Sequence, residues 1–341
     1  MKKDSKNKIN DQFTNKTVLI TGGTGSLGQA LTKRLLNSKV KAIRILSRNE
    51  NKQVEMESKL HDNRLRFFIG DIRDLPRLYR AFEGVDIVFH AAALKHVPVI
   101  EYNPFEAIKT NVVGSQNVID ACLYHNVSKV ICIGTDKAVS PLNTYGATKL
   151  LMEKLFVTGN SFLDEKKYKT KFIAVRYGNV LGSSGSVLPK FIKQIKNNEK
   201  ITITDPEMTR FSLTMDEALD FILNSVQIGK GSEVFIPKLK AYSINGLKES
   251  LLQLFGDSGV KIISLRPGEK MHETLLNNDE IRYTWELDGT YILFNSSKKE
   301  SEIKKSYPGI KKVKMSNAYT SNSVKELTTI ELKKIISKSI N

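Results

Sequence analysis

Two short segments of the chain combine residue types that can move protons at a carbon that is losing a hydride. Thr135, Asp136 and Lys137 are consecutive, and Tyr145 and Lys149 follow with the spacing YxxxK. Residues four apart on a helix project from one face, so the Lys149 ammonium would lie near the Tyr145 phenol. That charge would lower the phenol pKa and let Tyr145 accept a proton from an alcohol. Because YxxxK pairs also occur by chance, this interpretation depends on a cofactor site elsewhere in the chain.

A glycine-rich turn near the N-terminus predicts such a cofactor site. It has the spacing GxxGxxG, between a β-branched strand at 17–21 and a helical pattern at 27–36. Glycine lets the backbone approach a pyrophosphate closely, and the following helix N-terminus offers N–H donors. The alternative is a tight turn that binds nothing, but the strand–turn–helix context favours a dinucleotide. The expected contacts are Gly22, Thr24, Gly25, Ser26, Leu27 and Gly28.

The end of the second expected strand, 42–46, indicates which dinucleotide binds. NAD sites usually have Asp or Glu there, whereas this chain has Ser47, Arg48 and, one turn later, Lys52. Arginine and lysine suit a 2′-phosphate, so we expect NADP, with a solvated surface charge as the alternative for Arg48. Further cofactor contacts are expected after the strands at 66–69 and 86–90, at Asp71, Ile72, Ala91, Ala92 and Ala93.

Strands and helical patterns alternate along the first half of the chain. Strands are also expected at 129–133 and 171–175, and helices at 104–125 and 145–159. This alternation predicts an α/β fold, namely a Rossmann-type doubly wound parallel sheet with a smaller C-terminal α/β substrate lobe. Further helices are expected at 187–197, 215–227, 244–255 and 330–340. We expect a flexible leader at 1–15, the dinucleotide domain at 16–178 with later segments returning to it, the substrate lobe mainly at 179–315 and a tail at 316–341.

Composition limits the class of protein. Of the 341 residues 40% are hydrophobic and 26% charged, which is typical of soluble globular proteins. There is neither an apolar run long enough to span a bilayer nor a secretory signal at the lysine-rich N-terminus, so we expect no membrane partner. The net charge of +17 is dispersed, without interleaved aromatic residues, which argues against a nucleic-acid partner. Cys122 and Cys132 stand in apolar surroundings, which favours a reduced, cytoplasmic protein without disulfide or metal site.

Eight motifs occur in a fixed order: TGGTGSLG, SRNENKQ, GDIRD, AAALKHVP, TDKAVSPLNTYGATK, RYGNVLGSSGSVLP, TDPEMTRF and RPGEKMHE. Together they resemble the extended short-chain dehydrogenases/reductases that act on nucleotide sugars. Within that group the chain is most similar to the soluble, C5-inverting UDP-N-acetylglucosamine 4,6-dehydratases of the pseudaminic-acid type. The resemblance implies NADP, UDP-N-acetylglucosamine or a close UDP-sugar as substrate, a homo-oligomer, and a role in surface-glycan or nonulosonic acid biosynthesis.

The resemblance also implies a role for each catalytic residue. Tyr145 would serve C4, Lys137 would exchange the C5 proton and Asp136 would protonate the departing C6 hydroxyl, with Thr135 and Lys149 completing the set. Lys137 would then have to be partly neutral, which predicts a pKa lowered by burial or by Lys149. The alternative for the Asp136–Lys137 pair is an exposed ion pair at a strand end.

A nucleotide-sugar site is implied in the second half of the chain. Arg210 and Arg266 would clamp the diphosphate, since arginine forks match phosphate oxygens, and Glu269 would accept from the uridine ribose. The alternative for each arginine is a surface charge. Substrate contacts are expected at Lys95, Asn179, Ser184, Val187, Arg210, Arg266 and Glu269, and the remaining cofactor contacts at Lys95, Asn111, Tyr145, Lys149 and Tyr177.

Three other functions remain open from the sequence. Simple 4-epimerases of the resembled group usually carry small or hydroxyl residues at the positions of Asp136 and Lys137, which favours dehydration. A C5-retaining dehydratase is the second alternative, because inversion depends on which face Lys137 presents to the sugar. The third, from another class, is a non-catalytic NADP-sensing protein, which would not need an intact set of proton-transfer residues.

Overall fold

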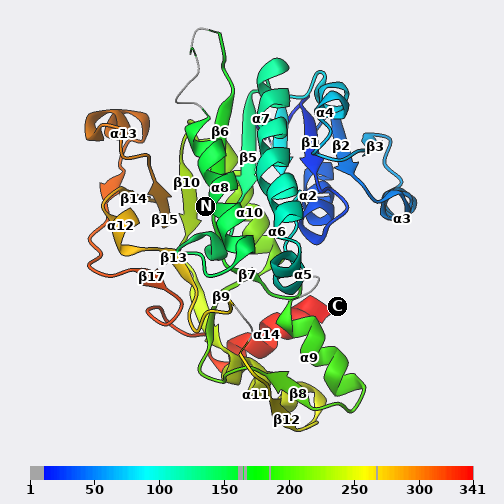
Figure 1. Cartoon of the computed structure of the whole chain (residues 1–341), viewed down its shortest axis with the longest axis vertical. Helices are drawn as coiled ribbons and strands as arrows, with labels where there is room; N and C mark the ends of the chain where they lie inside the picture. The colour runs from blue at the N-terminus through cyan, green and yellow to red at the C-terminus, as the bar shows by residue number, and fades with distance from the viewer. Residues whose placement is uncertain (1–10, 160–163, 165–166, 184–185, 266–267, 341) are drawn as a thin grey trace.

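A ten-stranded sheet forms the centre of the molecule in the computed structural model, which describes residues 11–159, 164, 167–183, 186–265 and 268–340 (Figure 1). Its order is β16-β14-β15-β10-β6-β5-β4-β1-β2-β3, and every strand from β10 to β3 runs parallel to its neighbours. The parallel strands are β1 (Thr17–Thr21), β2 (Ala42–Ser47), β3 (Leu65–Ile69), β4 (Ile87–His90), β5 (Lys129–Ile133), β6 (Lys171–Val175) and β10 (Val234–Pro237). This arrangement confirms the predicted α/β, Rossmann-type fold.

Helices cover both faces of this sheet because its strands alternate their side chains between two apolar layers. Along β1, Val18 and Ile20 join one core cluster and Leu19 the other. The first cluster takes residues from α2 (Ser26–Leu36), α3 (Glu50–Leu60) and α10 (Met215–Ile228), and the second from α4 (Leu75–Phe82), α7 (Gly114–Tyr124) and α8 (Thr144–Thr158).

The expected helix at 104–125 is interrupted by a wider turn. Between α6 (Pro104–Ala107) and α7 lies a π-helical segment, Ile108–Val113, and α5 (Val97–Tyr102) precedes α6. Asn111 sits in this segment and its amide group bonds both backbone groups of Leu94, at 2.8 and 3.0 Å. The π segment thus turns Asn111 toward the loop after β4, which a regular 3.6-residue pattern does not predict.

A smaller lobe lies at the carboxyl ends of the parallel strands (Figure 1). It contains the sheet β11-β9-β7, with β7 (Asn179–Val180), β9 (Thr209–Leu213) and β11 (Lys240–Ser243), and the pair β8 (Ile201–Ile203) and β12 (Val260–Ile262). The helices α9 (Val187–Lys196), α11 (Ile244–Phe255) and α14 (Thr329–Ile340) supply most of its core.

The C-terminal quarter of the chain is divided between the two lobes. The large sheet is extended by three antiparallel strands, β14 (Thr284–Leu287), β15 (Thr290–Leu293) and β16 (Lys311–Lys312). The same part of the chain contains the helices α12 (Asn278–Ile281) and α13 (Glu300–Ser306). The segment expected as a tail, 316–341, is instead packed where it is described. β17 (Tyr319–Thr320) pairs with β13 (Thr274–Leu276), and α14 contributes the buried side chains Leu332 and Ile336 to the lobe.

No helix in the described ranges is both long enough and apolar enough to cross a membrane. Those ranges also contain no group of three or more His, Cys, Asp or Glu residues that could hold a metal ion. Cys122 and Cys132 are both fully buried as free thiols, and burial raises the pKa of Cys132 to about 12. These thiols are therefore held protonated inside the core.

A buried ion-pair network fixes the helix α8 to the sheet. Arg176, directly after β6, donates to both carboxylate oxygens of Glu153 in α8 and to both of Glu280 in α12. Arg176 is fully buried, and although burial alone would lower its pKa, the two carboxylates raise it. All these polar atoms are thereby paired inside the protein, as buried charges require.

Replacing Arg176 should therefore be strongly destabilising. In Arg176→Met the buried Glu153 and the partly buried Glu280 both lose their counter-charge, which costs about 3–5 kcal/mol. Urea denaturation followed by circular dichroism measures this change. The matched control is Arg282→Met, which breaks an exposed pair with Asp279 and should change stability by about 0–1 kcal/mol. Equal losses in both variants would contradict the assigned role of the network.

Candidate functional site

A cavity of about 690 Å³ opens where the strand order reverses between β1 and β4. Crevices at such switch points are the usual ligand sites of open α/β sheets. The loops after β1 to β6 line it, together with β7 and residues of the smaller lobe. The lining includes every cofactor contact expected from the sequence except Asn111. The expected contacts along it are Gly22, Thr24, Gly25, Ser26, Leu27, Gly28, Ser47, Arg48, Lys52, Asp71, Ile72, Ala91, Ala92, Ala93, Lys95, Tyr145, Lys149 and Tyr177.

The glycine turn is shaped by close backbone approach. Gly22 has a φ of +67°, and a Cβ there would lie 2.8 Å from the backbone of Ala92. A Cβ on Gly28 would lie 2.5 Å from Gly23. Both positions therefore require glycine, and the turn brings the N-terminus of α2 to the cavity wall, where its free N–H groups favour an anion.

Asn111 lies behind the loop that it was expected to share with a cofactor. Its side chain donates to the carbonyl of Leu94, accepts from the Leu94 N–H and donates to Thr148. These bonds use its amide group to hold the loop after β4 in position. Asn111 thus supports the cavity wall in this structure and is not among the described residues that line it.

Charged residues surround the outer end of the cavity. The Arg48 guanidinium is 55% exposed and lies 3.7 Å from the Asp71 carboxylate, which Arg73 contacts at 2.7 Å. Burial alone would raise the pKa of Asp71, but the hydrogen bonds and charge of Arg73 and the charge of Arg48 lower it. Asp71 is therefore ionised, and Arg48 keeps an accessible positive head at the end of β2.

The catalytic residues expected from the sequence meet at the inner end of the cavity. After β5 the chain makes a 3₁₀ turn, Asp136–Ala138, and the Lys137 N–H donates to the Thr135 hydroxyl at 3.4 Å. This turn places Thr135 and Lys137 on the cavity wall, while Asp136 lies behind it with 1% exposure. Asp136 Oδ1 accepts from Thr135 Oγ1 at 3.0 Å and from Lys137 Nζ at 3.2 Å. The pair is thus buried rather than an exposed ion pair.

Tyr145 and Lys149 start α8 and both face the cavity, but their expected coupling is not found. The Lys149 ammonium donates to the Ile133 carbonyl at 2.6 Å, and burial lowers its pKa to about 8. Burial raises the pKa of Tyr145 to about 12, and the groups that oppose this rise are the charge of Lys137 and a hydrogen bond with Thr135. The prediction of a lowered phenol pKa is therefore wrong for this structure, because burial outweighs the nearby charge.

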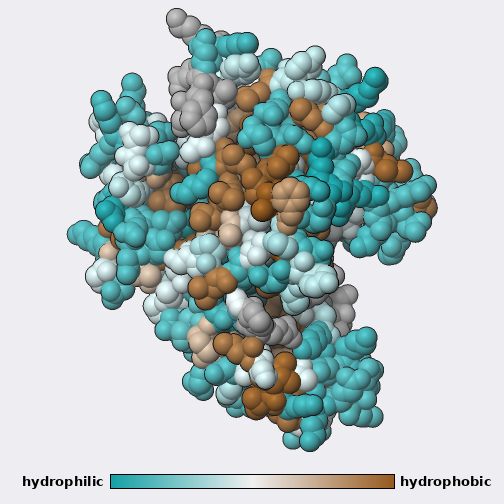
Figure 2. All heavy atoms as spheres, in the orientation of Figure 1, coloured by the Kyte–Doolittle hydropathy of each residue, from teal (hydrophilic) through white to brown (hydrophobic). Residues whose placement is uncertain are grey.

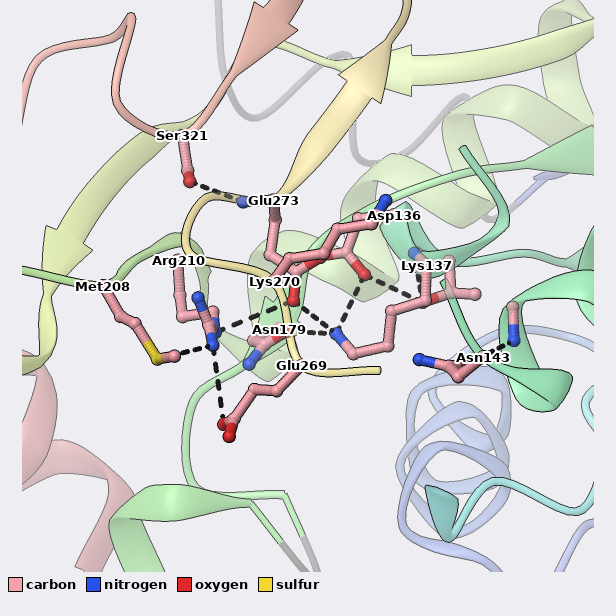
Figure 3. Close-up of polar contacts among 12 residues, drawn as sticks. Asp136, Lys137, Asn143, Asn179, Met208, Arg210, Glu269, Lys270, Glu273 and Ser321 are labelled. Atoms are coloured by element: carbon pink, nitrogen blue, oxygen red, sulfur yellow. Dashed lines mark hydrogen bonds and ion pairs between the residues drawn. The ribbon is translucent and has the colours of Figure 1, made fainter. Parts of the chain in front are cut away.

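The predicted neutral state of Lys137 is also wrong here. Burial alone would lower the pKa of this lysine, but the negative charges of Asp136 and Glu273 raise it well above its usual range. Lys137 Nζ lies 3.2 Å from Asp136 Oδ1 and 3.0 Å from Glu273 Oε1, as the dashed lines of Figure 3 mark. The lysine therefore carries its proton and presents an ammonium group to the cavity.

The expected substrate residues are only partly brought together. Asn179 lines the cavity and accepts from Lys137 Nζ at 3.4 Å. Arg210 is 6% exposed, and its guanidinium lies 3.7 Å from Glu269 and 3.6 Å from Glu273 (Figure 3). Glu269 thus faces Arg210 in this structure. Val187 begins α9 but is not among the described lining residues, and Ser184 and Arg266 lie outside the described residues.

Several polar residues of the site were not assigned from the sequence, namely Glu273, Thr110 and the lining residues Asn49, His96, Ser183 and Ser186. Glu273, which contacts Lys137 and Arg210, ends the motif RPGEKMHE, so the motif was noticed but its last carboxylate was not assigned. Thr110 lines the cavity from the π segment, and its buried hydroxyl has no hydrogen-bond partner among the described residues. The sequence around Thr110 contains no motif that predicts this position, because the π turn brings the residue to the cavity.

Comparison with known proteins places the chain in a family. Residues 18–295 match the model of a family described as polysaccharide biosynthesis protein. The chain belongs to that family. It is 46% identical, over 91% of its own length and 93% of the relative's, to the UDP-N-acetylglucosamine 4,6-dehydratase (inverting) of Campylobacter jejuni serotype O:23/36. These matches confirm the resemblance predicted from the sequence.

Two further relatives extend the comparison. A UDP-glucose 4-epimerase of Rickettsia akari is 41% identical, and the alignment covers 95% of this chain and 96% of that one. A solved structure described as Pen from Bacillus thuringiensis superposes with a TM-score of 0.89 at 39% identity, covering 96% of this chain and 99% of the other. Family membership therefore extends over both lobes, while the named activities of the relatives differ.

The buried Lys149 predicts a distinct dependence of stability on pH. Its folded pKa of about 8 lies below the ordinary value of roughly 10.4, so the charged amine costs stability below about pH 8. This cost disappears as the pH rises toward the ordinary value. In urea denaturation at several pH values, Lys149→Met should gain stability relative to the parent at pH 7, and the gain should shrink by about 2–3 kcal/mol toward pH 10.

The control for this experiment is Lys154→Met, which removes an exposed lysine from the same helix. Its stability difference from the parent should stay constant between pH 7 and pH 10. A Lys149→Met curve that runs parallel to the parent curve would show that the buried amine is not desolvated as described.

Proposed function

We propose that this protein is an NADP-dependent, C5-inverting UDP-N-acetylglucosamine 4,6-dehydratase. The observation that carries the proposal is the Asp136–Lys137 pair, which lies beside Tyr145 and Thr135 at the inner end of the large cavity. Oxidation at C4 alone needs only the tyrosine and its partners. Loss of water across C5 and C6 needs two more proton-transfer groups, and the pair supplies them. The 46% identity to an inverting dehydratase over nearly the whole chain supports the same assignment.

The cavity suits a nicotinamide dinucleotide. A side chain at Gly22 or Gly28 would clash with neighbouring backbone, so glycine at both positions keeps the turn tight enough for a pyrophosphate to approach. The N-terminus of α2 favours the negative charge of that pyrophosphate. Arg48, exposed at the end of β2, suits a 2′-phosphate, which is the reason to propose NADP over NAD. A nicotinamide dinucleotide held by these residues would supply the hydride chemistry, namely removal of hydride from C4 of the sugar and its return to C6.

The protein's own groups account for the proton movements. Tyr145 takes the proton from the C4 hydroxyl, and the Lys137 charge and the Thr135 hydroxyl are the groups that favour its phenolate. Lys137 takes the proton from C5, and Asp136 gives one to the C6 hydroxyl, which leaves as water. One proton must return to C5 when hydride reaches C6, so of the two protons taken up by Tyr145 and Lys137 one goes back to the sugar and the other restores Asp136. Transfer of one proton from Lys137 Nζ to Asp136 Oδ1, across 3.2 Å, makes the amine neutral and the carboxyl protonated together. That transfer leaves the net charge of the pair unchanged, so the buried site need not gain or lose charge.

A UDP-hexosamine 4-epimerase is the second candidate, favoured by the 41% identity to the Rickettsia akari 4-epimerase. An epimerase would share the glycine turn, Tyr145 and Lys149, and would leave the acid–base pair without a task. A C5-retaining dehydratase would use the same groups on the other face of the sugar. A non-catalytic NADP sensor accounts for none of the buried proton-transfer geometry.

The setting of the reaction follows from the proposed substrate. A UDP-sugar dehydratase would act in the cytoplasm, where UDP-sugars and NADP are available, and its keto product would feed surface-glycan or nonulosonic acid synthesis. We also propose that the chain works as a homo-oligomer, on the strength of the family resemblance alone.

The reaction can be tested by proton NMR of the purified protein with UDP-N-acetylglucosamine and NADP in heavy water. A new C6 methyl signal and deuterium at C5 are the expected results. Lys137→Ala should lower the rate of both by about 10²–10⁴-fold, as expected for loss of an acid–base group. Lys154→Ala, on the exposed face of α8, is the control and should match the parent. A changed C4 configuration with C6 intact would instead identify an epimerase.

The cofactor preference can be tested separately by fluorescence titration with NADPH and NADH. Arg48→Ala should raise the Kd for NADPH about tenfold or more, because a charge-assisted hydrogen bond is lost, and leave the Kd for NADH within about twofold. Lys41→Ala removes the same charge from an exposed position just before β2 and serves as the control. Equal weakening of both cofactors by Arg48→Ala would contradict a 2′-phosphate contact.

A further inference from the structure

Glu273 lies at the junction between the catalytic turn and the smaller lobe. Its side chain is 3% exposed, and Oε1 lies 3.0 Å from Lys137 Nζ and 3.6 Å from Arg210 Nε. Lys137 follows β5 and Arg210 lies in β9, so a single carboxylate oxygen joins residues of two sheets (Figure 3). Lys137 and Glu273 are 136 residues apart in the chain, so this contact exists only because of the tertiary fold.

The backbone of Glu273 is held firmly in place. Its N–H donates to Ser321 Oγ at 2.9 Å, and its carbonyl accepts from the Ser321 N–H at 2.8 Å. Ser321 is fully buried, and its hydroxyl also bonds Thr209, beside Arg210. The segment just after β17 thus fixes the depth at which the Glu273 carboxylate meets Lys137, as a precise proton-transfer site requires.

The second oxygen of Glu273 has an unusual environment for a structural carboxylate. Oε2 is buried and has no hydrogen-bond partner among the described residues, and the same is true of Asp136 Oδ2. A buried carboxylate oxygen without a partner is costly for stability; Glu233, which lies outside the cavity lining, also has one such oxygen. Two such carboxylates on either side of one ammonium group point to a role in controlling that group.

We propose that Glu273 is a positioning residue for the dehydration: its carboxylate holds Lys137 at the cavity wall and, with Asp136, sets the pH at which Lys137 gives up its proton. The inference rests on the proposed function, in which neutral Lys137 removes the C5 proton. The step is a plain proton transfer from Nζ to a flanking carboxylate or to solvent, and no other bond changes. Through Arg210 the same carboxylate ties the position of Lys137 to the smaller lobe.

The surrounding charges agree with this role. The charge of Glu273 raises the pKa of both Lys137 and Asp136, and burial alone would raise the pKa of Glu273 itself, which Lys137 and Arg210 lower. Removing the Glu273 charge should therefore make Lys137 easier to deprotonate. The titratable and charged groups that face this cluster from the elements around it are Asp136, Tyr145, Arg210, Tyr242, Glu269 and Lys270.

The test compares Glu273→Gln with Glu233→Gln, a matched variant that removes another fully buried carboxylate, one that is not among the residues lining the cavity. The rate of C5 deuterium exchange is measured from pH 6 to pH 10 in protein that retains its melting temperature and NADPH affinity. In Glu273→Gln the rise in rate with pH should move at least one pH unit lower, and the limiting rate should fall about tenfold. The substrate KM should stay within about threefold. Glu233→Gln should keep the parent profile.

Two further measurements keep the inference open to refutation. Glu273→Asp keeps the charge, so it should keep the parent pH profile with a lower limiting rate, and it replaces Glu273→Gln if that variant does not fold. NMR titration of ¹⁵N-labelled lysine, assigned with Lys137→Arg, follows the Lys137 amine without any turnover. An unchanged Lys137 titration in Glu273→Gln overturns the inference. Absence of the C6 methyl product in the parent protein would instead overturn the proposed function, while the titration would still decide the role of Glu273.

Discussion

The contact on which the rest of the site depends is a buried ammonium group between two carboxylates. Lys137 Nζ lies within 3.2 Å of Asp136 and 3.0 Å of Glu273, and both carboxyl groups are almost completely buried. Burying any one of these charges without a partner would cost several kcal/mol of stability, so each charged group depends on the opposite charges beside it. The position of β5, the turn after it and the approach of the chain before β13 are all constrained by the need to keep these three charges together.

The parts of the site that depend on local geometry could be predicted from the sequence. Gly22 and Gly28 were found because a strand, a turn and a helix follow one another within 20 residues, and Tyr145 and Lys149 because helix periodicity sets their spacing. The parallel sheet followed from alternating strands and helices, since that alternation leaves few topologies. In each case the decisive interactions lie close together in the chain.

The parts that depend on long-range contacts could not be predicted. Glu273 reaches Lys137 across 136 residues, and Asn111 reaches Leu94 only because of a π turn that no periodicity reveals. The predicted protonation states of Tyr145 and Lys137 were wrong for the same reason. The sequence places Lys149 near Tyr145 but does not say that its ammonium turns to the Ile133 carbonyl, or that burial outweighs charge at the phenol. The pKa of a buried group depends on all the charges and polar groups around it, and these are known only once the complete tertiary structure is known.

Two buried networks in this protein differ in how completely their charged groups are hydrogen-bonded. Arg176 satisfies both oxygens of Glu153 and both of Glu280, so that network is closed and its charges have one stable arrangement. The Lys137 cluster instead leaves one oxygen of each carboxylate without a hydrogen-bond partner among the described residues. In a closed network every acceptor is already occupied, whereas the Lys137 cluster keeps acceptor capacity on the same two carboxylates that already bond the amine through their other oxygens. The incomplete pairing is costly for stability, and in the proposed dehydration it would leave the two carboxylates able to share the Lys137 proton.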